Sequence, residues 1–100
     1  MILYVVDLDV DADLAEEYLL WLRAHMREML KLPGFIDAEL VKRLEPPSPE
    51  GRVNLGVRYR LRERAAFDDY LREYAPRMRA AGARFGERVR ASRQLMQTLE

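Results

Sequence analysis

The sequence contains no cysteine, one histidine and one tryptophan. The missing cysteine excludes a disulfide framework, a cysteine-based zinc site and a cysteine nucleophile. Apolar runs are too short to span a membrane, so we expect no membrane association. The first apolar residues are followed at once by Asp7 and Asp9, unlike the basic start and long apolar run of a signal peptide. A cytoplasmic location is the resulting expectation.

Charge of either sign is not in excess, because Lys+Arg and Asp+Glu both number 17. This balance predicts no general attraction to nucleic acid or to anionic membranes. Phosphate-binding glycine loops, zinc-ligand spacings and serine-centred triads are also missing. With 100 residues, the chain is long enough for one core, and we expect a single domain over residues 1–100 that needs no cofactor or metal.

Two amphipathic elements are predicted in the first third of the chain. Residues 2–10 alternate as a strand whose even-numbered side chains face the core. The spacing of Asp13 and Glu16 is that of a capping box, which predicts a helix beginning near Leu14. Pro33 and Gly34 end that helix. Its apolar arc carries Leu14, Ala15, Tyr18, Leu19, Leu22, His25, Met26, Met29 and Leu30.

The rest of the chain predicts two strands, a second helix and a last strand. Residues 35–45 and 52–62 alternate as strands joined by a hairpin over 46–51. A second amphipathic helix begins near Arg64, is interrupted at Pro76, and ends near Gly82 or Gly86. Residues 87–99 form the last strand. In the second strand we expect inward side chains at Ile36, Ala38, Leu40 and Leu44.

The order β-α-β-β-α-β is that of the ferredoxin-like fold, an α+β architecture. It predicts a four-stranded antiparallel sheet of order 4-1-3-2, with both helices on one face. The other face stays open and mixes apolar with charged side chains. We expect Asp7 and Asp9 to pair there with Arg58 and Arg60 across neighbouring strands.

The run from Trp21 through His25 to Leu32-Pro33-Gly34-Phe35, together with residues 70–79, resembles a family of small proteins of unknown function. That family belongs to the dimeric α+β barrel superfamily. The resemblance spans essentially the whole chain. It implies a homodimer in which the open sheet faces of two subunits pack together. Relatives include cofactor-free monooxygenases, isomerases and haem enzymes, so the resemblance indicates architecture better than chemistry.

His25 is the candidate catalytic residue, because it lies on the flank of the apolar arc, where the helix edge meets the sheet. A neutral imidazole there would act as a general base or orient a ligand oxygen. Trp21 would form a wall of the cleft, and Tyr4, Tyr18 and Tyr59 would line it as hydrogen-bond partners. The competing interpretation is a structural histidine and a core tryptophan.

Two other ligand classes are disfavoured. The carboxylates Asp7, Asp9, Asp37 and Glu39 alternate with arginines, which favours ion pairs over a metal site. His25 would be the one histidine available to haem, and the chain is short for a haem enzyme of this superfamily. RNA recognition on this fold needs aromatic side chains on the open sheet face, and none is expected there.

Two functions remain open from the sequence. In the first, a homodimer binds a small, partly apolar molecule in a cleft between helix and sheet, and cofactor-free acid/base chemistry takes place there. In the second, the protein is a structural or regulatory dimerisation module with no ligand and no catalysis. The mixed, open sheet face motivates the second.

Overall fold

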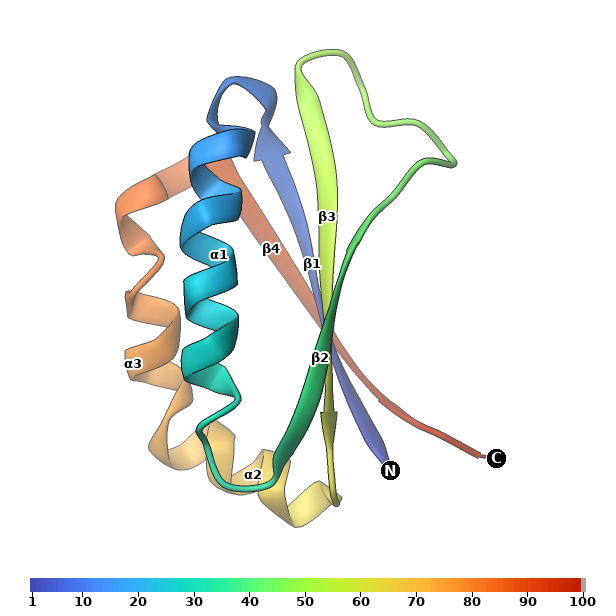
Figure 1. Cartoon of the computed structure of the whole chain (residues 1–100), viewed down its shortest axis with the longest axis vertical. Coiled ribbons are helices and arrows are strands. Elements are labelled where there is room, and N and C mark those ends of the chain that lie inside the picture. Colours follow the sequence, from blue (N-terminus) through green and yellow to red (C-terminus); the bar gives the residue numbers. More distant parts are fainter. Residues whose placement is uncertain (100) are drawn as a thin grey trace.

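The computed structural model describes residues 1–99 and shows helices packed against one face of an antiparallel sheet (Figure 1). The elements are β1 (Ile2–Asp11), α1 (Ala15–Met29), β2 (Phe35–Lys42), β3 (Arg52–Leu61), α2 (Arg64–Glu73), α3 (Ala75–Ala80) and β4 (Val89–Gln97). The sheet order is β2-β3-β1-β4. This confirms the ferredoxin-like prediction and its strand order. In the part of the chain described, no helix is long and apolar enough to cross a membrane.

The strand β1 lies in the middle of the sheet and pairs antiparallel with both β3 and β4. Because strand side chains alternate between faces, its even-numbered residues point toward the helices, as predicted. Tyr4, Leu8 and Val10 are buried there. The odd-numbered Leu3 and Val5 lie on the opposite, open face, where they help to line a shallow depression.

The helix α1 begins differently from the prediction. A short 3₁₀ turn over Ala12–Leu14 precedes it, and the Asp11 carboxylate accepts the Asp13 backbone N–H at 3.2 Å. Leu14 at the N-cap of α1 forms no side-chain capping bond. The predicted capping box of Asp13 and Glu16 is therefore wrong, because the chain turns two residues earlier and Asp11 provides the cap.

The turn after α1 brings the chain back against α2. Gly34 has φ +85°, and a Cβ at this position would overlap Cβ of Ala66 in α2. The Gly34 carbonyl accepts the Arg62 backbone N–H at 3.0 Å, at the end of β3. Glycine is required here by both the backbone angle and the close approach.

The inward face of β2 was predicted only in part. A register irregularity between Phe35 and Asp37 turns Phe35 into the core. Ala38 and Leu40 face inward as expected. Ile36 is instead 39% exposed and Leu44, beyond the strand end, is 74% exposed, so both predictions were wrong. A bulge places an extra residue in one strand, and a strict period of two cannot represent it.

The predicted ion pairs of Asp7 and Asp9 with Arg58 and Arg60 are also wrong. Asp7 lies opposite Gly56 and Asp9 opposite Asn54 in the register of β1 with β3. The arginines pair with β2 instead, because Glu39 lies opposite Arg58 and Asp37 opposite Arg60. Asp9 pairs with Arg52 at 3.0 Å. Ion pairing of Asp9, Asp37 and Glu39 is confirmed, with partners that depend on the register.

Pro76 divides the second helical segment, as predicted. The helix α2 ends at Glu73, Tyr74 leaves helical geometry with φ −121°, and α3 begins with Pro76 in its first turn. A 3₁₀ segment over Ala83–Arg88 follows, and Gly86 within it has φ +56°. After the break at Pro76, α3 and the 3₁₀ segment run beside α1 (Figure 1), and the chain then continues into β4.

Candidate functional site

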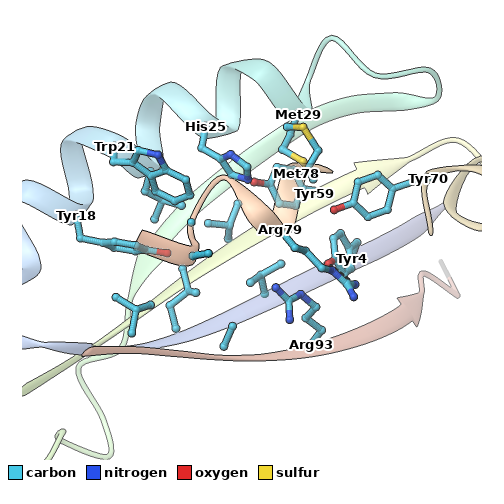
Figure 2. Close-up of a pocket in the computed structure, with 18 of the residues that line it drawn as sticks. Tyr4, Tyr18, Trp21, His25, Met29, Tyr59, Tyr70, Met78, Arg79 and Arg93 are labelled. Atoms are coloured by element: carbon cyan, nitrogen blue, oxygen red, sulfur yellow. Dashed lines mark hydrogen bonds between the residues drawn. The ribbon is translucent and has the colours of Figure 1, made fainter. Parts of the chain in front are cut away.

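A cavity of about 250 Å³ lies between α1, α3 and the helix-covered face of the sheet. The five side chains chosen from the sequence all line it: Tyr18, Trp21 and His25 from α1, and Tyr4 and Tyr59 from β1 and β3. Figure 2 shows them with aliphatic neighbours, Arg79 and Arg93. The buried face of α1, with Leu22 and Met29, lines the cavity together with Trp21 and His25 at the edge of that face.

The helix side of the cavity is an aromatic stack. The His25 and Trp21 rings are 4.6 Å apart between centroids and 15° from parallel. Phe85 meets the Trp21 ring edge-on at 5.3 Å and the Tyr18 ring at 4.9 Å. A Cβ on Gly82 would lie 3.1 Å from the Trp21 ring, so a larger residue there would require the indole to shift by a few tenths of an ångström. These contacts fix the orientation of Trp21 and, through it, of the imidazole.

The His25 imidazole is half-buried, and its environment favours the neutral form. Desolvation by burial lowers the pKa of His25 below its usual 6.5, and the nearby Glu28 carboxylate opposes this effect in part. A neutral imidazole can accept a proton. Within residues 1–99 no hydrogen bond joins His25 to Tyr4, Tyr18 or Tyr59. The expected tyrosine partners are therefore absent, and the observed contact of the imidazole is the stack of its ring face on the Trp21 indole.

The sheet side of the cavity carries several phenols. The Tyr4 ring stacks on Tyr59 with centroids 5.9 Å apart and meets Tyr70 at 5.6 Å. Burial raises the pKa of Tyr18 to about 12 and also raises the pKa values of Tyr59 and Tyr70. These phenols are therefore protonated at neutral pH and can donate hydrogen bonds.

Two of these hydroxyl groups are available to a ligand. Tyr18 and Tyr59 form no side-chain hydrogen bond within residues 1–99. In the same residues, no fully buried side-chain nitrogen or oxygen lacks a hydrogen-bond partner. Both hydroxyl groups consequently keep accessible surface, and both residues line the cavity. They add hydrogen-bonding groups to a wall that is largely aromatic and aliphatic.

Three polar residues of the cavity wall were missed from the sequence: Tyr70, Arg79 and Arg93. Nη2 of Arg79, in α3, donates a hydrogen bond to the Tyr4 hydroxyl at 3.3 Å. Arg93 shares the inward face of β4 with Val89 and Ala91. Strand parity could have identified Arg93, since it lies two residues from Ala91 and two from Leu95. No pattern signalled Arg79, because its placement depends on the helix restart at Pro76.

The whole chain is similar to solved structures of ferredoxin-like proteins. One is MhuD, a haem-degrader from Mycobacterium tuberculosis, with TM-score 0.75 and 17% identity over 100% of this chain and 97% of that one. A protein from Deinococcus radiodurans, described as an antibiotic biosynthesis monooxygenase, has TM-score 0.72 and 15% identity over 100% and 94%. A dimeric ferredoxin-like protein from an uncultured marine organism has TM-score 0.66 and 9% identity over 99% and 95%.

At these identities the similarity establishes the fold and not the chemistry. The class is therefore that of proteins with the ferredoxin-like fold. Within it, the chain belongs to the family described as a domain of unknown function, DUF4286, which matches residues 1–99. None of the proteins with curated descriptions matches the chain.

Proposed function

We propose that the protein is a homodimer that binds a small, partly apolar molecule in the cavity between α1, α3 and the sheet. The observation that carries this proposal is the composition of the cavity wall. Aromatic and aliphatic side chains form most of it, and His25, Tyr18 and Tyr59 add a few polar groups that point inward (Figure 2). Small-molecule sites have this combination of an apolar wall and sparse, convergent polar groups.

His25 is the residue we propose for acid/base chemistry. Its neutral imidazole would accept a proton from a bound ligand, and the phenol of Tyr59 or Tyr18 would donate a hydrogen bond to the oxygen where charge develops. The stack with Trp21 holds the ring against the cavity. Such a reaction needs no group beyond these side chains, and it transfers a proton only.

Haem, which MhuD binds, does not fit this cavity. The volume of about 250 Å³ is below the roughly 300 Å³ at which pockets for drug-sized ligands begin, and a porphyrin is larger than most such ligands. The proposed chemistry therefore does not involve haem.

The open sheet face supports the homodimer. A shallow depression there is lined by Leu3, Val5, Val41 and Met96, with charged side chains such as Asp7 and Arg58 around them. An apolar streak within a charged rim is typical of an association surface. One structural neighbour is described as dimeric. Assembly without a ligand is the second candidate function, and it depends on this face alone.

Ligand-induced thermal stabilisation tests the binding function. We expect at least one compound in a panel of small carbonyl and aromatic molecules to raise the melting temperature of the wild type. H25A should fold and lose this rise, whereas R27A, changed on the exposed side of α1, should keep it. If no compound shifts the wild type, the binding proposal is contradicted and assembly alone is favoured.

A further inference from the structure

We infer that the molecule bound in this cavity is a small carboxylate with an apolar body, and that Arg79 and Arg93 bind its carboxylate group. This inference rests on the proposed binding function, because it specifies the ligand of the same cavity. It narrows the ligand from any partly apolar molecule to a carboxylate with an apolar body.

The charge of the cavity wall is the first argument. Two guanidinium groups, those of Arg79 and Arg93, line the cavity, and no aspartate or glutamate does. Within residues 1–99 neither arginine has a carboxylate oxygen within 4 Å, and both side chains line the cavity while they remain exposed to solvent. The cavity thus has positive charge that the described side chains do not balance. An anion would balance it.

The placement of the two arginines is the second argument. They come from different elements, α3 and β4, and Figure 2 shows both beside Tyr4 at one end of the cavity. The hydrogen bond from Nη2 of Arg79 to the Tyr4 hydroxyl holds that guanidinium in place. A guanidinium has five N–H donors, so most remain free for a ligand. Paired donors from two planar groups match the two oxygens of a carboxylate.

The α1 side of the cavity determines the body of the ligand. Trp21, His25 and Met29 form that wall, with apolar surface and a flat aromatic face. The volume of about 250 Å³ exceeds the roughly 150 Å³ of an engineered cavity that admits benzene. One ring with a short acidic side chain fills such a space. The ring would pack near Trp21, and the carboxylate would reach Arg79 and Arg93.

The test compares phenylacetate with phenylacetamide, which has the same shape and no charge. Heteronuclear NMR titration of the full chain measures both dissociation constants, and the indole N–H signal of the single tryptophan reports binding in the cavity. We expect phenylacetate to bind at least 10-fold more tightly than the amide. R79Q and R93Q should each weaken phenylacetate roughly 10- to 100-fold and leave the amide unchanged. R77Q, on the exposed side of α3, should change neither.

The outcomes separate this inference from the function on which it rests. If the amide binds as tightly as the acid, or if R79Q and R93Q bind phenylacetate like the wild type, the inference is overturned while cavity binding stands. If neither compound shifts the Trp21 signal, the inference is overturned, and the thermal-shift panel decides separately whether the cavity binds any ligand. Higher salt should weaken only the acid, because screening acts on the charged pair.

Discussion

His25 is the sole histidine of the chain, and its ring packs in an aromatic stack. It is therefore both a packing residue and the proposed acid/base group. The Trp21 ring covers one face of the imidazole. Burial then removes water from the ring and lowers its pKa. The indole therefore helps to keep His25 neutral near pH 7, which is the form that an acid/base role requires.

Acid should destabilise the protein through His25. In the unfolded chain the histidine pKa is about 6.5, and folding lowers it. Below pH 6.5 the unfolded state therefore binds more protons, so the free energy of unfolding falls as pH falls from 6.5 through the folded pKa. Urea denaturation of the wild type between pH 7.5 and about pH 5 should show this loss.

The control for this prediction is H25Q, which removes the titrating group and keeps a polar side chain of similar size. Its free energy of unfolding should depend less on pH over the same range. An equal pH dependence in the two proteins would show that other groups, such as the surface carboxylates, cause the loss.

At the scale of elements, the turn between α1 and β2 determines how closely the first half of the chain approaches the second. Gly34 lies against Ala66 of α2, and Arg62 at the end of β3 donates its backbone N–H to the Gly34 carbonyl. One residue later Phe35 enters the core. A glycine with positive φ here serves both the backbone path and the contact of this turn with α2.

Alanine substitutions at Gly34 and Gly51 should separate the cost of the backbone angle from the cost of the contact with Ala66. G51A is the matched control, because Gly51 has φ +83° and no other atom lies within 4 Å of the position that a Cβ would take there. G51A should lose about 1–2 kcal/mol of unfolding free energy from the backbone alone. G34A should lose a further ~1–3 kcal/mol, because its methyl group overlaps Ala66. Both values are measurable by urea denaturation.

The double variant G34A/A66G tests the cause of the larger loss. Removing the Ala66 methyl group should recover most of the difference between G34A and G51A, after allowance for glycine in a helix, about 1 kcal/mol. If G34A and G51A lose the same free energy, the contact with Ala66 contributes nothing.

Elements with a regular period were predictable, and irregular ones were not. The inward face of β3, with Leu55, Val57, Tyr59 and Leu61, was identified correctly, because a strand paired on both sides has to keep strict alternation. The bulge that turns Phe35 inward and the cap at Asp11 were missed. Each shifts the chain by one or two residues from the regular pattern, and a strict period does not represent such a shift.

The same division applies to the cavity. Tyr4 and Tyr59 follow from strand parity, and Trp21 and His25 from their place on the flank of a helical arc. Arg79 and Arg93 were missed, because a charged residue is ordinarily assigned to solvent. Their side chains reach the cavity only because α3 and β4 close its end.

At the scale of the whole molecule, β1 separates the two surfaces to which we assign functions. Tyr4, Val6 and Leu8 line the cavity on one face of the sheet. Leu3 and Val5 line the depression on the other. A dimer formed through the open face would therefore leave the cavity of each subunit on the outside of the assembly, with its entrance unobstructed by that interface.

Substitution on the open face should dissociate the proposed dimer. In a symmetric dimer V5E places two carboxylates in the interface, and a buried unpaired charge costs about 3–5 kcal/mol. Dimerisation should weaken more than about 100-fold. Sedimentation velocity over a range of concentrations measures this shift. L20E, on the exposed side of α1, is the control and should sediment like the wild type.

A wild-type protein that sediments as a monomer at every concentration would contradict the dimer and, with it, assembly as the function. Ligand binding in the cavity is measured separately, so it would survive that result.

The position of β1 also bears on which length changes the family can accept during evolution. Inserting or deleting a single codon within β1 would exchange its two faces, sending Tyr4 or Leu8 outward and Leu3 or Val5 inward. Both surfaces would be lost in one step. The exposed segment from Arg43 to Glu50 carries no such alternation, and we expect length variation among family members to concentrate there.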